Sequence, residues 1–287
     1  MFKYLIYKIS QFIVHRFSRQ DSYKFAMFLS DIQYYLSFRD RRAVQNNLKV
    51  ILGTEENLNI RAREVFRNFG KYLADFFRMV KTLDEQYIRE NVKIKNMERL
   101  HSVLKGGKGC IVVTAHLGNW ELGAAVLSLV GAPLQVIALP HKERPVNDLF
   151  NAQRERWRIN VVPSNLAVRK CLETLRNNRC VALVADRDFS AHGERMDFLG
   201  RQMLIPKGAA IFSAKTAAPI LPVFMIREPD DSYTLSVEEP IFPPQPASET
   251  VDKDIALGIM SRYKEVIEKK IRKYPTQWLM FREFWTQ

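Results

Sequence analysis

The sequence predicts an α/β protein with a largely parallel sheet, helices on both faces of the sheet, and an amphipathic helical region at the N-terminus. From residue 108 onward, short β-branched runs alternate with longer segments of helical periodicity, which is the order of strand–helix–strand units. Before that point, apolar residues recur at helical spacing with basic residues between them. With 47% hydrophobic and 11% aromatic residues, the 287-residue chain can bury a core of this kind.

The helical region comes first along the chain. Large apolar residues repeat at helical spacing through residues 2–17 and are interrupted by basic residues. Such a helix suits the interface of an anionic bilayer, whereas the alternative is a helical hairpin packed on the main domain. We favour the interface for residues 2–17 and core packing for residues 23–38, which repeat the pattern. A third helix, over residues 65–80, carries a phenylalanine-rich stripe typical of a core.

Basic residues outnumber acidic ones. Lys and Arg number 44 against 31 Asp and Glu, which gives a net charge of +13. Such an excess is typical of proteins with an anionic partner: a nucleic acid, a membrane surface or a phosphorylated substrate. No stretch provides the roughly 20 apolar residues of a spanning helix or the apolar run and cleavage site of a signal peptide. We therefore expect a mature protein that lies on a membrane and does not cross it.

The α/β region is predicted element by element. Strands are expected at residues 110–115, 134–139, 159–163, 180–186, 220–226 and 233–239. Helices are expected at residues 119–131, 146–158, 165–177, 207–217 and 251–274. Alternation in the last strand suggests a more exposed edge of the sheet. The residues between the fourth strand and the helix at 207–217 are expected to form a loop.

One segment, VVTAHLGNWELG at residues 112–123, has residues suited to catalysis. His116 lies just past the end of a buried strand, where open α/β sheets bind ligands, and Glu121 lies in the first turn of the next helix. Gly118 permits the turn that would bring them together, and Asn119 is a good helix cap. A neutral imidazole can accept a proton from an alcohol near neutral pH. A carboxylate on its other ring nitrogen would hold the tautomer, as in a catalytic triad without the serine.

Other patterns narrow the chemistry. No GxSxG elbow is present and none of the three cysteines has a nucleophile motif, so we expect the acceptor alcohol itself to attack the thioester. The cysteines also lack CxxC spacing, so no metal site is expected. The non-catalytic alternative is a strand-end histidine, with Glu121 favouring the helix N-terminus. GGKG at residues 106–109 misses the Walker pattern at two positions. No nucleic-acid-binding signature accompanies the charge, so we expect no nucleic-acid partner.

HLGNWE resembles the His–four residues–Glu/Asp motif of the lysophospholipid acyltransferase superfamily. Further blocks narrow the resemblance to its lipid A biosynthesis (lauroyl/myristoyl-type) acyltransferase family, whose members add a secondary acyl chain to the glycolipid core of lipopolysaccharide. These blocks occur in the family's order along nearly the whole chain: RRAVQNNLKVILG (41–53), VFRNFGKYLADFFR (65–78), ADRDFSAHGERMDFLG (185–200) and YPTQWLMFREFW (274–285).

The resemblance implies a set of site residues. His116 and Glu121 would be the catalytic pair, and the candidate substrate-binding residues are Arg154, Asp186, Asn119 and Arg187. Arg154 is expected to grip a phosphate in bidentate fashion, unless it belongs to a solvated helix face. For Asp186, a local ion pair with Arg187 is an equal alternative.

The resemblance also implies a glycerol-phosphate-acyltransferase-like, mixed sheet of about seven strands. Acyl carrier protein or coenzyme A would supply the thioester, with no further cofactor. We expect residues 1–85 to form a helical, membrane-interfacial region and residues 86–287 an α/β acyltransferase domain that is one catalytic unit. The enzyme would work at the cytoplasmic face of the inner membrane, attracted by its anionic surface.

Two departures from the family pattern concern the acceptor. Met280 and Arg282 stand where the C-terminal block often has tryptophan and histidine, and the expected membrane span is reduced to an amphipathic helix. The family also includes enzymes that acylate mannosylated phosphatidylinositol. The acceptor is therefore expected to be a phosphorylated glycolipid, most simply a lipid A precursor, with another glycolipid or a lysophospholipid as the alternative. A non-catalytic membrane lipid-binding protein is the alternative of a different class, but it would not need a His–Glu pair.

Overall fold

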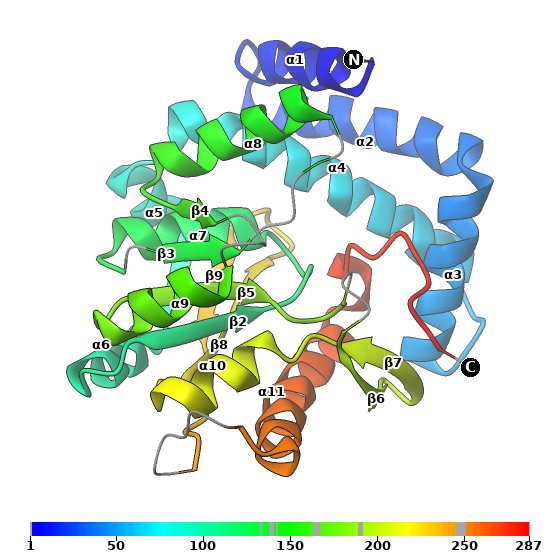
Figure 1. Cartoon of the computed structure of the whole chain (residues 1–287). Coiled ribbons are helices and arrows are strands. Elements are labelled where there is room, and N and C mark those ends of the chain that lie inside the picture. The colour runs from blue at the N-terminus through cyan, green and yellow to red at the C-terminus, as the bar shows by residue number, and fades with distance from the viewer. Residues whose placement is uncertain are drawn as a thin grey trace.

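The computed structural model describes residues 2–132, 134–137, 141, 143–162, 167–188, 192–244 and 251–286. A twisted sheet lies between helical layers, and the N-terminal helices cover one end of the molecule (Figure 1). These are α1 (Phe2–Val14), α2 (Arg19–Leu36), α3 (Phe38–Leu52) and α4 (Leu58–Thr82). The aromatic stripe of α4 is buried, with Phe66, Phe76 and Phe77 at most 1% exposed, which confirms its expected core position.

The main sheet is mixed and has seven strands, as expected. Its order is β1 (Val92–Lys95), β9 (Tyr233–Val237), β8 (Ile220–Arg227), β2 (Cys110–Thr114), β5 (Cys180–Val184), β3 (Leu134–Ile137) and β4 (Asn160–Val162). Neighbouring strands are parallel except β8 and β9, which pair antiparallel. The carboxyl ends of β2 and β5 therefore meet at one edge of the sheet.

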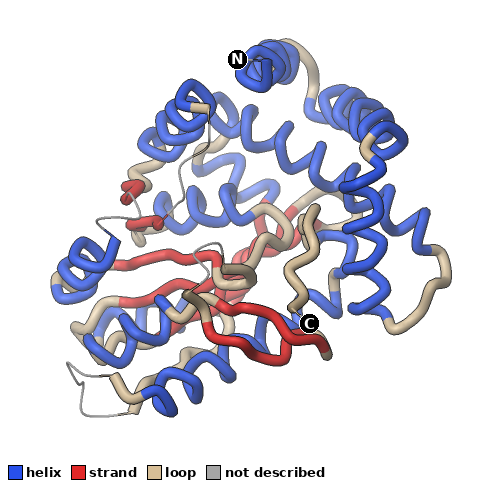
Figure 2. Tube along the Cα trace, turned by 45° about the vertical axis from the view of Figure 1, so that its right-hand side comes forward, coloured by secondary structure: helices blue, strands red, loops and turns tan. Residues whose placement is uncertain are grey.

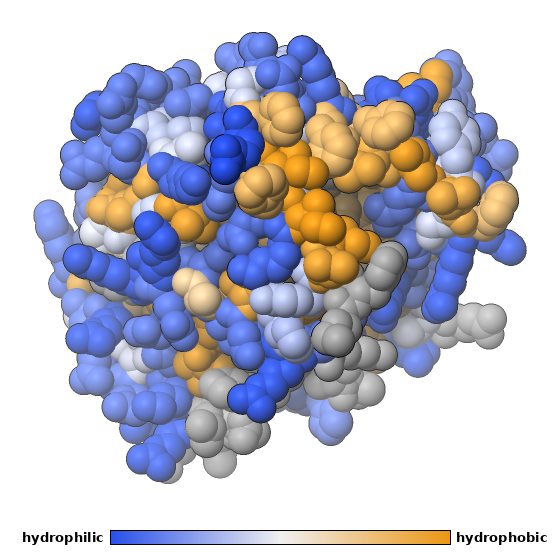
Figure 3. Space-filling model, turned by 90° about the horizontal axis from the view of Figure 1, so that it is seen from above, coloured by the Kyte–Doolittle hydropathy of each residue, from blue (hydrophilic) through white to orange (hydrophobic). Residues whose placement is uncertain are grey.

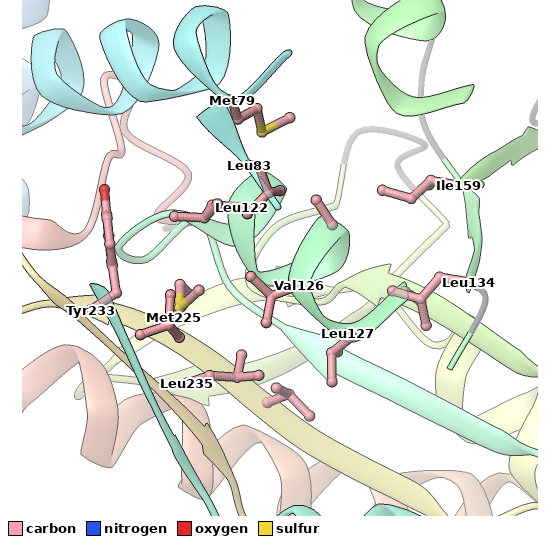
Figure 4. Close-up of a cluster of buried hydrophobic side chains, with 14 of the residues drawn as sticks. Met79, Leu83, Leu122, Val126, Leu127, Leu134, Ile159, Met225, Tyr233 and Leu235 are labelled. Atoms are coloured by element: carbon pink, nitrogen blue, oxygen red, sulfur yellow. The ribbon is translucent and has the colours of Figure 1, made fainter. Parts of the chain in front are cut away.

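Helices cover both faces of this sheet. They are α5 (Glu85–Asn91), α6 (Met97–Lys105), α7 (Trp120–Leu129), α8 (Arg144–Arg156), α9 (Ala167–Arg176), α10 (Gly208–Thr216) and α11 (Lys253–Lys273), followed by the 3-10 turn η2 (Pro275–Gln277). Alternate residues of β2 point to opposite cores, Val112 toward the α7 side and Val113 toward the α10–α11 side. In the α7-side core, Leu122 and Val126 face Met225 of β8 (Figure 4).

Two predictions about strands are wrong. The last strand, β9, is no exposed edge: all five of its residues are buried, because β1 pairs along its outer side and completes the sheet. The residues expected to form a loop before α10 contain a hairpin, β6 (Glu194–Phe198) and β7 (Arg201–Ile205). The C-terminal segment lies along this hairpin (Figure 2), since Trp285 bridges to Met203 and the Thr286 amide donates to Gln202 at 2.8 Å. Residues 138–139, 163, 165–166 and 189–191, which belong to predicted elements or blocks, lie outside the described residues.

The prediction of core packing for residues 23–38 is wrong for the large apolar side chains of α2. Phe25, Phe28, Leu29, Ile32 and Leu36 are each 36–74% exposed, and apolar residues form a broad band on this end of the molecule (Figure 3). The buried residues of α2 are instead Ser22, Tyr23, Ser30 and Tyr34. Small residues lie where α2 meets α4, since a Cβ added to Gly70 of α4 would collide with Ser30 Oγ.

Candidate active site

The turn after β2 places His116 at the carboxyl edge of the sheet. Gly118 has a φ of +65°, and a Cβ there would collide with the Met225 carbonyl oxygen, so only glycine fits. The Asn119 amide donates to that same carbonyl at 2.8 Å, and the Asn119 side chain accepts from the Leu122 amide at 3.1 Å. The predicted glycine turn and asparagine cap are both confirmed. The turn is further fixed from the C-terminus, because the Leu279 amide donates to the His116 carbonyl at 2.8 Å.

Asp186 holds the imidazole of His116. The His116 Nδ1 lies 2.7 Å from Asp186 Oδ1, and the His116 amide donates to Asp186 Oδ2 at 3.0 Å. The indole Nε1 of Trp278 donates to the same Oδ2 at 2.8 Å. Burial would raise the pKa of the Asp186 carboxyl, but His116, Arg187 and the Trp278 N–H together lower that pKa to about 2. Asp186 is therefore an ionised, fully buried acceptor.

Arg187 lies at the other ring nitrogen, with Nη2 3.0 Å from His116 Nε2. A guanidinium can only donate and a carboxylate can only accept, so these two partners assign the neutral tautomer with hydrogen on Nδ1 and a lone pair on Nε2. That is the tautomer of a base. The His116 side chain is 16% exposed, and the Trp120 ring packs edge-on against it at 5.0 Å between centroids. Burial lowers the pKa of Arg187 below its ordinary value, and Asp186 partly offsets this.

Glu121 does not hold His116, contrary to the sequence prediction. Its carboxylate forms a bidentate ion pair with Arg154 of α8, with Nη2 2.5 Å from Oε1 and Nε 3.1 Å from Oε2. Both side chains are about nine-tenths buried, at 8% and 11% exposure. Burial would lower the pKa of Arg154, but Glu121 raises it above its ordinary value, so the guanidinium stays charged. His116 and Glu121, five positions apart in the chain, therefore have different partners. His116 contacts Asp186, and Glu121 contacts Arg154.

Two of the other predicted site residues, Asn119 and Asp186, are buried, so their contacts are with other parts of the protein. Asn119 is 1% exposed, caps α7 and donates from its side-chain amide to the Tyr233 hydroxyl at 3.3 Å, so it builds the turn. Asp186 has no exposed surface and contacts His116, so within this structure its side chain meets the histidine and not the solvent. Arg187 is the member of the predicted substrate-binding set that contacts Nε2 of His116 directly.

Sequence reasoning missed the aromatic residues around the histidine. Trp278 orients Asp186, Trp120 contacts His116, and Tyr72 of α4 stacks on Trp120 at 4.4 Å between centroids. Trp278 belongs to the C-terminal block YPTQWLMFREFW, which was the available signal, although no spacing links it to residue 116. Within the described ranges, no group of three His, Cys, Asp or Glu side chains is placed to hold a metal ion. In the same ranges, no helix is long and apolar enough to span a bilayer.

Fold and site together define an α/β protein with a buried aspartate hydrogen-bonded to a histidine at the carboxyl edge of its sheet. The chain belongs to the bacterial lipid A biosynthesis acyltransferase family, whose profile matches residues 3–287. It is 25% identical over 227 residues to the phosphatidylinositol mannoside acyltransferase of Mycolicibacterium smegmatis, covering 78% of this chain and 71% of the relative. It is 24% identical over 219 residues to the lipid A biosynthesis palmitoleoyltransferase of Escherichia coli, covering 75% and 68% respectively. The protein is therefore an acyltransferase of the type that acts on glycolipids.

Proposed function

We propose that the protein transfers a fatty acyl chain from an acyl thioester to a hydroxyl of a lipid, with His116 as the general base and Asp186 as the carboxylate that orients it. The observation that carries this proposal is the 2.7 Å contact between His116 Nδ1 and Asp186 Oδ1, which leaves Nε2 as the proton acceptor. The proposed base pair is thus His116 with Asp186, in place of His116 with Glu121.

The proposed reaction begins when the acceptor hydroxyl replaces Arg187 at Nε2. The hydroxyl oxygen attacks the thioester carbonyl carbon while its proton passes to Nε2, and ionised Asp186 stabilises the imidazolium. Collapse of the tetrahedral adduct breaks the C–S bond, and the imidazolium returns the proton to the leaving thiolate. The displaced Arg187 guanidinium, whose Nη2 lies 3.0 Å from Nε2 before the hydroxyl binds, would then donate to the carbonyl oxygen as negative charge develops there.

The acyl chain has a candidate site beyond the histidine. A cavity of about 360 Å³ lies among α1, α2 and α4, with mostly apolar lining residues that include Tyr7, Leu29, Phe69 and Leu73. Phe69 also contacts Tyr72, which stacks on Trp120 beside His116, so one row of rings joins the cavity to the base. We assign this cavity to the hydrocarbon of the donor, whose length it would limit.

The acceptor proposed here is a phosphorylated glycolipid of the inner membrane, most simply a lipid A precursor. A phosphatidylinositol mannoside is the second candidate, because two phosphatidylinositol mannoside acyltransferases match the chain at 25% and 26% identity. Acyl carrier protein or coenzyme A would carry the donor chain. The enzyme would act from the cytoplasmic face as a peripheral protein, with residues 2–17 at the interface.

The test is a transfer assay with purified enzyme, a radiolabelled acyl thioester on either carrier, and lipid A precursor or phosphatidylinositol mannoside as the acceptor. We expect product with one carrier and one acceptor, and its loss in His116→Ala. Mass spectrometry of lipids from a strain that lacks the gene should show one lipid class short of one acyl chain. Normal transfer by a folded His116→Ala protein would contradict the proposed base, and lipid binding without any transfer would favour the non-catalytic lipid-binding class.

A further inference from the structure

The ring nitrogen of His116 that would accept a proton is already occupied. Arg187 Nη2 lies 3.0 Å from Nε2, and with hydrogen on Nδ1 the Nε2 lone pair accepts this guanidinium N–H. A lone pair engaged in this way cannot at the same time accept a proton from a hydroxyl or from water. The His116 side chain is also only 16% exposed, with the Trp120 ring against it. Arg187 must therefore move before His116 can act as a base.

Arg187 also lies against the C-terminal segment. Its Nη1 is 3.6 Å from the sulfur of Met280, and its guanidinium lies over the Phe284 ring, 5.7 Å from the centroid. Burial lowers the pKa of Arg187, Asp186 partly offsets this, and the like charge of Arg282 lowers that pKa further. Arg282 is exposed and lies between Met280 and Phe284 in the chain. Two guanidinium groups, those of Arg187 and Arg282, are therefore close to one another beside the base.

A phosphate is a stronger acceptor for a guanidinium than the groups that Arg187 contacts at His116 and along the C-terminal segment. An imidazole nitrogen, a thioether sulfur and an aromatic ring are neutral, whereas a phosphate accepts two parallel charge-assisted hydrogen bonds from one guanidinium. Asp186, next to Arg187 in the chain, already accepts from His116 and Trp278. An anion between Arg187 and Arg282 would also offset the repulsion between these two charges.

A free Nε2 beside a bound thioester would promote hydrolysis of the donor. Water could pass a proton to Nε2 while its oxygen attacks the carbonyl carbon, and collapse of the adduct would break the C–S bond. The imidazolium would return the proton to the thiolate, so the products would be a fatty acid and a free thiol. Exclusion of water from the reacting groups prevents such side reactions. A guanidinium on Nε2 has the same effect, because it leaves water no base to use.

We propose that Arg187 is a gating residue: its guanidinium occupies Nε2 and prevents hydrolysis of the acyl donor until a phosphate group of the acceptor binds between Arg187 and Arg282 and draws the guanidinium away. The inference rests on the proposed function, since it takes His116 as the general base and a phosphorylated lipid as the acceptor. It assigns the acceptor phosphate to Arg187 and Arg282 in place of Arg154, which the ion pair with Glu121 holds. The five N–H donors of a guanidinium allow Arg187 to bind the phosphate and still donate to the developing oxyanion.

The first measurement is the chemical reactivity of Nε2, which is independent of the enzyme's own reaction. Diethyl pyrocarbonate adds an ethoxycarbonyl group to an accessible imidazole nitrogen, with loss of ethanol and carbon dioxide, and peptide mass spectrometry gives the rate for each histidine. We expect His116 in Arg187→Met to react at least about tenfold faster than in the wild type, each at the plateau of its pH profile, because one hydrogen bond to a charged group is removed. His101, exposed on α6, is the internal reference, and Arg201→Met, at an exposed arginine of β7, is the matched control.

Inorganic phosphate is the probe for the anion, compared with sodium chloride at equal ionic strength. In the wild type, phosphate should raise the carbethoxylation rate of His116 saturably, whereas a ligand that merely covers the site would protect the histidine. Phosphate should leave the rate unchanged in Arg187→Met. Arg282→Gln should need roughly tenfold more phosphate for half the effect, because one of the two charged donors is lost.

The second measurement is hydrolysis, without any acceptor, of a fatty acyl thioester of N-acetylcysteamine, which has no phosphate of its own. Phosphate should raise hydrolysis by the wild type over the same concentration range in which it raises carbethoxylation. It should not raise hydrolysis by His116→Ala, which lacks the base.

Circular dichroism and thermal melting confirm that each variant is folded, and the phosphate titration of the wild type needs no variant. Equal carbethoxylation of His116 in the wild type and in folded Arg187→Met overturns the proposal, as does phosphate that protects His116 or acts no more than chloride does. Faster carbethoxylation with phosphate but without faster hydrolysis overturns the role of Arg187 against water. Failure of the proposed function gives a different result, because His116→Ala would then keep normal transfer whatever the carbethoxylation rates are.

Discussion

Asp186 contacts His116 twice, through the Nδ1 of its ring at 2.7 Å and through its backbone amide at 3.0 Å. One carboxylate therefore fixes the tautomer of the His116 imidazole and also holds the His116 backbone just after the end of β2. The two residues lie on adjacent parallel strands, since β2 pairs with β5 through Thr114 and Val184 just before them. The sheet itself thus brings His116 and Asp186 together.

The first prediction concerns this pair. His116→Ala should lower turnover by about 10²–10⁴, the usual contribution of a positioned base. Asp186→Asn should lower turnover by a similar factor, because an amide can donate to Nδ1 and favour the wrong tautomer. The double variant should be little worse than His116→Ala, since the residues act as a unit. Additive losses in steady-state turnover would mean that Asp186 does not act through His116. The control is Asp254→Asn, at the start of α11, which should leave turnover unchanged.

The second prediction concerns Trp278 as a positioning residue. Trp278→Phe removes the N–H donor to Asp186 and keeps an aromatic ring in the core. We expect turnover to fall by about tenfold with an unchanged Michaelis constant, since one hydrogen bond to a charged group contributes about 1.5–3 kcal/mol. The acidic limb of the pH–rate profile should also shift. A purely structural role for Trp278 would lower the melting temperature and leave the profile in place; Trp285→Phe serves as the comparison.

The third prediction separates two roles of Arg154. If the Arg154 guanidinium acts as the ion-pair partner of Glu121, Arg154→Lys and Glu121→Gln should each destabilise the fold by about 3–5 kcal/mol. The reason is that each variant leaves a buried charge without its bidentate partner. The double variant should then show no further loss of stability. If the guanidinium binds a substrate phosphate, Arg154→Lys should keep the melting temperature and raise the Michaelis constant for the glycolipid. Thermal melting together with acceptor titration decides between them. Arg156→Lys, at the exposed end of α8, should be neutral in both.

The fourth prediction concerns acid stability. The folded-state pKa of Asp186, about 2, lies below its value of about 3.9 in an unfolded chain, so the unfolded state binds the proton first as the pH falls. The stability that this carboxylate contributes is complete above about pH 5 and is lost progressively as the pH falls from about 5 to about 1, by roughly 2.6 kcal/mol in total. Denaturant unfolding at stepped pH values should show the gap between wild type and Asp186→Asn closing in that window. A constant gap would contradict the assigned ionisation.

The fifth prediction concerns the cavity among α1, α2 and α4. Leu73→Trp fills part of its volume, so the enzyme should accept shorter acyl chains and lose activity with longer ones. The measurement is the relative rate across a series of donor chain lengths. Leu129→Trp, at the exposed end of α7, is the matched control and should leave the series unchanged. An identical chain-length series in folded Leu73→Trp would exclude the cavity as the acyl site.

The sequence by itself determined the features that depend on neighbours along the chain. The alternation of strands and helices, the buried α4, the position of His116 past a strand, the Gly118 turn and the Asn119 cap all follow from local periodicity and backbone preference, and the structure shows each of them. The Gly118 turn and the resemblance of HLGNWE to the His–four residues–Glu/Asp motif also predict Glu121 as the partner of His116, and this prediction is wrong.

Only the tertiary structure decided the partnerships. His116 and Asp186 are 70 residues apart and meet because β2 and β5 pair in parallel. Glu121 lies on α7, before β3 in the chain, and its partner Arg154 lies on α8, after β3. Periodicity showed that α2 has an apolar stripe but not which way it faces. The direction was set by the small residues opposite Gly70, because the closest backbone contact determines which side of a helix turns inward.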